Sequence, residues 1–415
     1  MIKLKRKALT KYKKRKTDQA WEEYKNLRNF VNTAVKSEKR GFLLHSFRTD
    51  PKNFWRVLKY LNIYSGSSRD APLPEAASPD DFNNYYLSNI PQSDLANENF
   101  VNDNYSDKKF NPLLIDGFSF SVVEPQEVEG ILNRIGSQAT GPDGINIRMI
   151  MYCMPLILPH LTYLINKCLS SNKFPRQWKC ANVIPVPKIS QPTDISHYRP
   201  ISILPTMSKV LEKIVDRQFG SFLAEGKILP STQSGFRSNH STTTALLKVT
   251  DDILCASDKG QNTCLILLDY SKAFDTLDHK LLFAKLLYFG VGNDALDFFK
   301  SYFTGRSQRV CFRSSFSSYL PVVKGVAQGS IIGPMMFSLY TSDFSGLIKH
   351  CSSHQYADNT QLYLSFPYSD IETAFKKINS DLQILASVSQ AHGLLLNENK
   401  TKLLIFGKDK LKVMN

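Results

Sequence analysis

The 415-residue sequence has no long apolar run, no paired-cysteine motif and no internal repeat. Its longest apolar stretches, such as Cys264–Leu268, are far shorter than the roughly 20 residues that cross a bilayer, so we expect no membrane span. The seven cysteines are scattered without a C-x-x-C pair, which argues against a disulfide framework or a structural zinc site. No secretory signal pattern begins the sequence, so we expect an intracellular protein.

Positive charge is abundant but unevenly placed. The net charge is +15, and residues 1–60 alone hold 18 Lys and Arg against five Asp and Glu. Such a basic block can neutralise phosphates and predicts contact with nucleic acid. A solvated helix face or a nuclear-import signal remains the alternative. The residues expected to bind nucleic acid are Lys13, Lys14, Arg15 and Lys16.

Composition and periodicity divide the chain into three parts. Residues 1–63 form a basic arm, and the absence of Gly and Pro before Gly41 predicts one long helix over 1–45. Residues 64–119 are rich in Ser, Asn, Asp and Pro, which indicates a loop-rich connector with one short helix near 80–87. Residues 120–410 alternate helical and strand patterns in an α+β order, with strands mainly antiparallel.

Two segments in this last part deliver a carboxylate at the end of a strand. Asp269 follows an apolar strand, and Asp358-Asn359 stands at the expected tip of a hairpin. Taken singly, each is most simply an ordinary turn. Between them, the glycines of Lys324–Pro334 precede an apolar helix predicted over Ser330–Tyr340. We expect those glycines to allow close backbone approach to a ligand and to leave the amides of the helix N-terminus available.

These three segments together resemble motifs A, B and C of the reverse transcriptase palm, closest to jockey-type non-LTR retrotransposons. The resemblance implies a right-hand polymerase fingers–palm fold, with an antiparallel palm sheet packed on helices and the basic helical arm in front. Further matching segments extend it over residues 120–410 in the order of the family: Thr140–Ile145, Ile184–Lys188, His197–Pro205, Gln233–Arg237 and Leu396–Lys402.

The resemblance implies an RNA-directed DNA polymerase. Its partners would be an RNA template, a DNA primer and dNTPs, and no pattern indicates an oligomeric state. Two Mg²⁺ ions, or Mn²⁺, would be held by Asp269 and Asp358, with Asn359 beside them, because phosphoryl transfer builds charge that hard cations stabilise.

The same resemblance assigns residues to the nucleotide. Lys188, Arg199 and Lys400 would lie on the triphosphate, and Gln328 and Gly329 would contact the incoming nucleotide. Phe274 would be the steric gate that excludes a ribose 2′-hydroxyl. The simpler alternatives are surface ion pairs for Arg199 and Lys400 and a core position for Phe274.

The sequence departs from the family at three places. Asn359 replaces the second motif-C aspartate, which predicts impaired catalysis, and Ala327 replaces a proline of motif B. The last motif lies close to Asn415, so we expect a fragment without the thumb and the endonuclease. A catalytically inactive nucleic-acid-binding remnant is therefore the main alternative. An RNA-dependent RNA polymerase is a third possibility, which Phe274 disfavours. The basic arm and the resemblance together predict a nuclear location.

Overall fold

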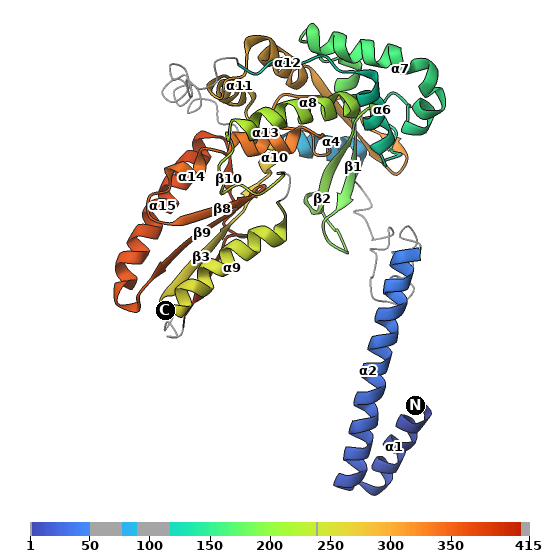
Figure 1. Ribbon diagram of the computed structural model, residues 1–415, viewed down its shortest axis with the longest axis vertical. Coiled ribbons are helices and arrows are strands. Elements are labelled where there is room, and N and C mark those ends of the chain that lie inside the picture. The colour runs from blue at the N-terminus through green and yellow to red at the C-terminus, as the bar shows by residue number, and fades with distance from the viewer. Residues whose placement is uncertain (1, 50–76, 89–116, 238–239, 408–415) are drawn as a thin grey trace. The chain divides into compact units, whose positions relative to one another are not determined.

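The computed structural model describes residues 2–49, 77–88, 117–237 and 240–407 (Figure 1). The chain divides into two compact units. One comprises Met1–Leu73 with Ile189–Pro192, and the other comprises Pro74–Lys188 with Thr193–Asn415. Each is described by itself. Among the described residues, no single helix is both long and apolar enough to span a bilayer.

The first unit contains a pair of helices, α1 (Ile2–Arg15) and α2 (Asp18–Thr49). The prediction of one continuous helix is wrong, because Lys16 has a left-handed φ of 50° that ends α1. The Thr17 hydroxyl then accepts a hydrogen bond from the Ala20 amide at 3.4 Å, which helps α2 begin. The two helices pack against each other, and Nζ of Lys11 in α1 donates to Oε2 of Glu23 in α2 at 2.6 Å.

The second unit contains a mixed five-stranded sheet with the order β2-β1-β5-β6, in which β7 also pairs with β5. β1 pairs antiparallel with β2 and parallel with β5. Pro185 and Pro187 lie beyond the β5-paired stretch Cys180–Val183, so their missing N–H groups cost no hydrogen bond to β5. The strands are β1 (Cys180–Pro187), β2 (Tyr198–Ile203), β5 (Arg306–Phe312), β6 (Ser315–Phe316) and β7 (Leu320–Val322).

The short helix α4 (Pro79–Ser88) docks on this sheet and confirms the helix expected near 80–87. Phe82 is fully buried, with its ring 5.2 Å from that of Tyr198. Asn83, also buried, donates from Nδ2 to the Ser318 carbonyl at 2.9 Å. Most of the remaining connector lies outside the described residues.

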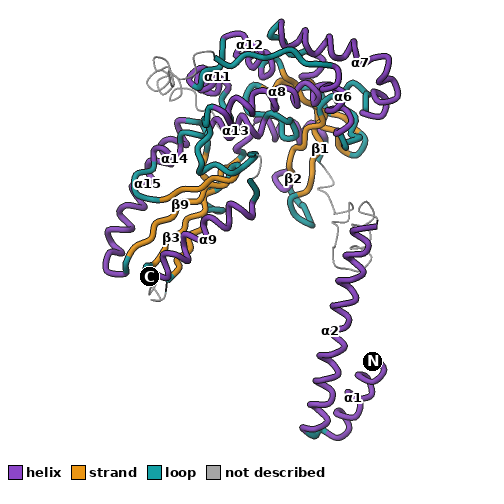
Figure 2. Tube along the Cα trace, in the orientation of Figure 1, coloured by secondary structure: helices purple, strands orange, loops and turns teal. Residues whose placement is uncertain are grey.

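The second sheet of this unit is antiparallel throughout, with the order β11-β3-β9-β8. One face, with Ile266 and Leu268, joins the main core, and Leu265 on the other face packs on Val249 of α9. Helices α9 and α15 flank the strands (Figure 2). The elements are β3 (Asn262–Leu268), β8 (Ser352–Tyr356), β9 (Asn359–Phe366), β11 (Lys402–Phe406), α9 (Thr242–Asp258) and α15 (Ile371–Ala391).

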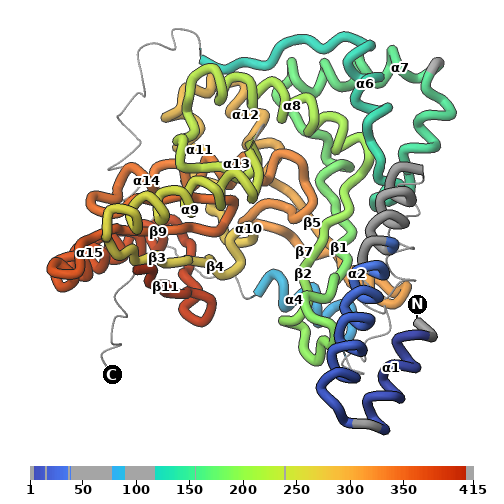
Figure 3. Tube along the Cα trace, turned by 60° about the horizontal axis from the view of Figure 1, so that its bottom comes forward, coloured from blue at the N-terminus to red at the C-terminus, as the bar shows by residue number. Residues whose placement is uncertain are grey.

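The remaining helices pack around the sheets (Figure 3) and share one apolar core with the antiparallel sheet. Fully buried aromatic rings of α8, α12 and α13 lie at its centre: Phe219, Phe298, Phe299 and Phe337. The helices are α6 (Pro125–Arg134), α7 (Ile147–Ser170), α8 (Thr206–Glu225), α10 (Ala273–Thr276), α11 (His279–Tyr288), α12 (Asn293–Phe303), α13 (Gly333–Tyr340) and α14 (Phe344–Leu347). Two short strands, β4 (Tyr270–Ser271) and β10 (Leu395–Leu396), pair near the end of β3. The expected α+β class is confirmed.

Candidate active site

Asp269 stands at one end of the antiparallel sheet, directly after β3. Its backbone carbonyl accepts a hydrogen bond from the Asn397 amide at 2.8 Å, which fixes the strand exit. Its carboxylate Oδ1 lies 3.1 Å from Nζ of Lys400, and 24% of the side chain is exposed. The carboxylate is therefore partly accessible from solvent, with a well-exposed lysine as its counter-ion.

Asp358 lies at the same end of the sheet, in the turn between β8 and β9. Tyr356 pairs with Asn359, so Ala357 and Asp358 form a two-residue turn, and Ala357 has a left-handed φ of 57°. The turn is thus one residue earlier than the sequence predicts. Burial raises the pKa of Asp358, and the charge of Asp269 raises it further, while Lys400 and Arg199 lower it. A cation bound between the two carboxylates would relieve their repulsion.

Asn359 is exposed and is the first residue of β9. The last β3–β9 pair is Leu268 with Thr360, so Asn359 continues the register opposite Asp269. Its amide oxygen can ligate a hard cation but adds no charge. Within the described residues, no cluster of three His, Cys, Asp or Glu side chains could hold a metal. Two carboxylates and neutral oxygens fit a divalent ion, with one negative charge fewer than a third carboxylate would give.

Phe274 lies in α10, beside the aromatic rings of two other segments. Its ring centroid is 4.8 Å from that of Phe337 and 6.2 Å from that of Phe236. Its carbonyl accepts from the Val326 amide at 2.8 Å, which joins α10 to the glycine-containing loop before α13. Phe274 is half-buried, so one part of the ring packs in the core and another part remains accessible.

The glycine-containing loop is held against β2 rather than left open. The carbonyl of Gln328 accepts from the Ser202 amide at 2.7 Å. Gly329 has a φ of +125°, and a Cβ there would lie 2.6 Å from the Ser202 carbonyl oxygen. The close backbone approach predicted for Gly329 therefore occurs with β2, where only glycine fits.

The amides at the start of α13 are occupied, so their predicted availability is wrong. The helix begins at Gly333, three residues after the expected Ser330. The Ile331 amide donates to Oε2 of the buried Glu212 at 2.6 Å, and the Gly333 amide donates to the Ser330 hydroxyl at 3.2 Å. Burial raises the pKa of Glu212. The Ser330 contact holds the loop to itself, and the Glu212 contact holds it to α8.

The three expected triphosphate-binding cations influence one another or the carboxylates. Burial lowers the pKa of Lys188, and the charges of Arg199 and Lys400 lower it further. Nζ of Lys188 donates to the Ser196 carbonyl at 2.7 Å, and Arg199 is exposed on β2. Lys188 and Arg199 thus come from the mixed sheet and Lys400 from the segment before β11. The charges of Arg199 and Lys400 act on Asp358, whereas the carboxylate that acts on Lys188 is Asp275.

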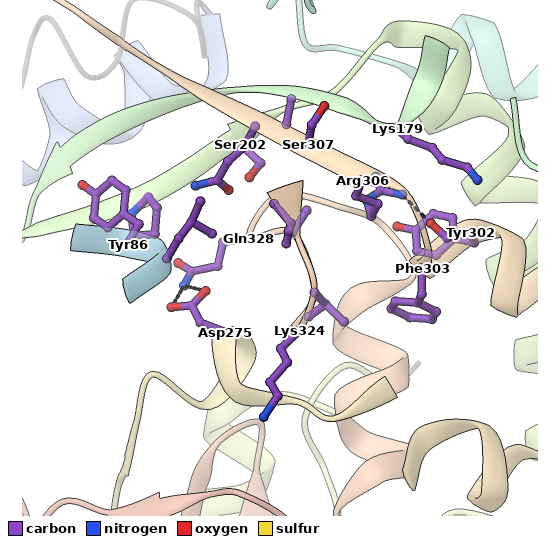
Figure 4. A pocket seen from close by; sticks show the side chains of 18 residues that line it. Tyr86, Lys179, Ser202, Asp275, Tyr302, Phe303, Arg306, Ser307, Lys324 and Gln328 are labelled. Atoms are coloured by element: carbon purple, nitrogen blue, oxygen red, sulfur yellow. Dashed lines mark hydrogen bonds between the residues drawn. The ribbon is translucent and has the colours of Figure 1, made fainter. Parts of the chain in front are cut away.

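A small cavity of about 50 Å³ lies between α4, the mixed sheet and the glycine-containing loop (Figure 4). Asp275, Gln328 and Tyr86 line it. Both carboxylate oxygens of Asp275 accept hydrogen bonds from Nε2 of Gln328, at 2.9 and 3.1 Å. Sequence reasoning missed Asp275, although it directly follows the expected steric gate and was a visible acidic residue of that motif.

Gly235, in the matching segment Gln233–Arg237, shapes the hairpin that carries Asp358. A Cβ at Gly235 would lie 2.1 Å from the backbone nitrogen of Ala357. The neighbouring Ser234 amide donates to the Gln355 carbonyl at 2.8 Å, so this segment runs beside β8. No local pattern reveals this contact, because it joins residues far apart in the sequence.

The basic residues of the arm lie at the end of α1. Lys13, Lys14 and Lys16 are exposed, and Arg15 is the last residue of the helix. Near them, the rings of Tyr12 and Trp21 lie 4.8 Å apart. The arm therefore presents cations beside an aromatic pair, a combination suited to a nucleic-acid backbone and its bases.

Comparison with known proteins identifies the class. Residues 186–414 match the family described as "Reverse transcriptase (RNA-dependent DNA polymerase)". This match covers more than half of the chain and includes every candidate site residue except those of the arm. The chain belongs to the reverse transcriptase family.

Several similar proteins come from insect mobile elements. The chain is 33% identical over 228 residues to a probable RNA-directed DNA polymerase from transposon X-element of Drosophila melanogaster, covering 53% of this chain and 24% of that protein. It is 31% identical over 232 residues to the RNA-directed DNA polymerase from mobile element jockey of the same species, covering 54% and 24%. The expected resemblance to jockey-type non-LTR elements is confirmed. The chain spans about a quarter of the length of these relatives.

Proposed function

We propose that this chain is an RNA-directed DNA polymerase domain of a jockey-type non-LTR retrotransposon. The five-stranded sheet would belong to the fingers and the antiparallel sheet would be the palm. The observation that carries the proposal is the meeting of Asp269 and Asp358 at one end of the antiparallel sheet. The end of β3 and the β8–β9 turn would deliver them to a common site, with Phe274 on α10 and Gln328 on the glycine-containing loop.

The substrates would be an RNA template, a DNA primer and dNTPs. The primer 3′-oxygen attacks the α-phosphorus, the bond to pyrophosphate breaks, and the 3′-hydroxyl proton is lost. Two Mg²⁺ or Mn²⁺ ions, held by Asp269 and Asp358, would supply charge stabilisation at the attacking and leaving oxygens.

The other residues bind and select the nucleotide. Lys188, Arg199 and Lys400 are positioned to attract the triphosphate. Gln328 contacts the nucleotide from the loop that Gly329 allows to approach β2. Phe274 excludes the ribose 2′-hydroxyl.

Asn359 is expected to weaken this activity. A charge pair at 4 Å is worth about 4 kcal/mol at an effective dielectric of 20, and solvent reduces that figure. A loss of even about 1.4–2.8 kcal/mol corresponds to a roughly ten- to hundredfold weaker ion affinity or slower reaction. We therefore expect a slow enzyme whose activity an added carboxylate restores.

A catalytically inactive nucleic-acid-binding protein is the second candidate. It is favoured by the missing charge at Asn359 together with the ion pair between Lys400 and Asp269, since the lysine competes with a cation for that carboxylate. The two candidates share the arm and the fold and differ only in turnover.

Primer extension separates them. A DNA primer on an RNA template is incubated with dNTPs in Mg²⁺ and then in Mn²⁺, for the wild type, Asn359→Asp and Asp269→Ala. Extension that Asn359→Asp raises roughly tenfold or more and Asp269→Ala abolishes supports the polymerase. If neither the wild type nor Asn359→Asp extends a primer that both bind, the binding protein becomes the better account.

We also propose that the arm binds nucleic acid and directs the protein to the nucleus. The support is the exposed lysine cluster at the end of α1. A tagged protein that stays in the cytoplasm, unaffected by substitution of Lys13, Lys14 and Lys16, would contradict the nuclear part of this proposal.

A further inference from the structure

Asp275 is a carboxylate that the reaction as described does not use. It lies in α10, one residue after Phe274, and lines the cavity in Figure 4. Its hydrogen bonds within the described residues go to Nε2 of Gln328. Burial raises its pKa to about 6, while Gln328, Lys272 and Lys188 act in the opposite direction. The carboxylate is thus costly to keep ionised near neutral pH.

The two ends of Gln328 are fixed by different elements. Its backbone carbonyl is bound to the Ser202 amide of β2, and its side chain reaches across 53 positions of sequence to Asp275 of α10. An ionised carboxylate has only acceptors, so the Gln328 amide must turn its NH₂ group toward Asp275. The Gln328 oxygen Oε1 is therefore the atom left to meet another molecule.

Charged and hydroxyl groups lie around Asp275, and none of those in the described part of the chain forms an ion pair with it. Nζ of Lys272 is buried, has no hydrogen-bond partner among the described residues, and lies 4.6 Å from the centre of the Tyr85 ring. Lys188 approaches from the end of β1 and bonds Ser196. Tyr86 of α4 lines the same cavity, and burial raises the pKa of its hydroxyl. The other charged side chains along the cavity are Lys179, Arg306 and Lys324.

A carboxylate is not the residue that stability alone would favour here. Asparagine has nearly the same shape and could accept from Gln328 without burying a charge. Asparagine could also rotate its amide and let Gln328 bind in either orientation. Of the two side chains, only an ionised carboxylate holds the Gln328 amide in a single orientation.

We propose that Asp275 is a positioning residue that orients the Gln328 amide for the incoming nucleotide. The inference rests on the proposed function and names an additional determinant of nucleotide affinity at that site. Asp275 does not touch the nucleotide itself. Its effect passes through Gln328, and it is lost when the carboxylate is neutral.

Equilibrium binding of a dNTP tests this without requiring turnover. The protein is bound to an RNA template with a primer that ends in a dideoxynucleotide, so that the next complementary dNTP binds but cannot react. The variants are Asp275→Asn, Gln328→Ala and the double variant. Asp381→Asn is the matched control, because Asp381 is a buried carboxylate that accepts from the Lys349, His350 and Cys351 amides.

We expect Asp275→Asn and Gln328→Ala each to raise the dNTP Kd roughly three- to tenfold, as expected for a misdirected hydrogen bond. The double variant should be no weaker than Gln328→Ala, because the two residues act as one unit. The wild-type Kd should rise as the pH falls through about 6, whereas that of Asp275→Asn should not. Asp381→Asn should lower the melting temperature and leave the Kd unchanged.

Two results would overturn the inference while leaving the polymerase proposal intact. One is wild-type affinity in Asp275→Asn. The other is a double variant whose dNTP Kd exceeds that of Gln328→Ala by the same factor by which Asp275→Asn raises the wild-type Kd. If the wild-type complex binds no dNTP although it binds the primer–template, both the inference and the proposed function fail.

Discussion

At the scale of single residues, the site holds more positive than negative charge. Arg199 and Lys400 act on the pKa of Asp358, Lys188 and Lys272 act on that of Asp275, and a neutral asparagine follows Asp358. This excess of positive charge attracts a triphosphate, which is negatively charged, and disfavours free divalent cations. We therefore expect ion binding to depend strongly on bound nucleotide.

Phe274 gives a residue-scale prediction about sugar selection. Phe274→Val should raise ribonucleotide incorporation relative to deoxyribonucleotide by roughly tenfold or more, because it removes the ring proposed to exclude the 2′-hydroxyl. Competitive primer extension with both nucleotides measures the ratio. Phe337→Leu removes the ring that packs on Phe274 and should lower stability without a comparable change in selection. An equal change in both variants would assign Phe274 to the core alone.

Asp275 gives a prediction about stability and pH. Its pKa is about 6 in the folded protein against an ordinary 3.8. A raised carboxyl pKa stabilises the fold at low pH, and this contribution is lost as the pH rises through the folded value. Relative to wild type, Asp275→Asn should therefore gain about 1–2 kcal/mol in unfolding free energy between about pH 4 and pH 7. Urea unfolding across that range measures it, and a difference independent of pH would contradict the assignment.

At the scale of elements, the site depends on segments pressed together by backbone contacts. Gly325, like Gly329, leaves no room for a side chain, since a Cβ there would lie 2.6 Å from the Asp275 carbonyl oxygen. Gly235 likewise leaves no room for a Cβ, because one there would overlap the Ala357 backbone in the β8–β9 turn. The backbone of Asp275 in α10 and that of Ala357 beside Asp358 are therefore each packed against a neighbouring loop.

Gly235→Ala tests this at the β8–β9 hairpin. The new Cβ would overlap the Ala357 backbone, so the turn carrying Asp358 must shift. We expect a loss of about 1–3 kcal/mol in stability and of roughly tenfold or more in primer extension. Gly346→Ala is the control, because a Cβ at Gly346 meets nothing within 4 Å. Equal behaviour of the two variants in both assays would show that the turn tolerates displacement.

At the scale of the whole molecule, charge and catalytic geometry belong to different units. Residues 1–60 carry most of the net charge of +15, whereas every candidate catalytic residue lies in the second unit. Affinity for nucleic acid and selection of nucleotide should therefore be separable by mutation.

Substituting Lys13, Lys14 and Lys16 by alanine should weaken primer–template binding and reduce its salt dependence. Each lost phosphate contact lowers the slope of log K against log salt by roughly 0.7–0.9. Binding titrations at several salt concentrations measure the slope. The matched control removes three exposed lysines from helices of the second unit, Lys213, Lys300 and Lys377. An equal effect in the control would point to net charge alone.

Local sequence patterns predicted much of the second unit. The apolar run before Asp269 predicted β3, and Asp358-Asn359 predicted the hairpin of β8 and β9. Helical periodicity did not reveal the break at Lys16, because a single left-handed residue leaves composition unchanged. Helices α7, α8, α9, α11 and α12 were not predicted individually.

The sequence by itself determined the class of protein, since its motifs stand in order along the chain. It also determined which residues bear charge. Only the tertiary structure decided that Gln328 bonds Asp275, that Gly235 supports Ala357, and that Lys400 reaches Asp269 across 131 positions. The physical reason is that local preferences act over a few neighbouring residues, whereas these contacts exist only once distant strands and loops have packed together.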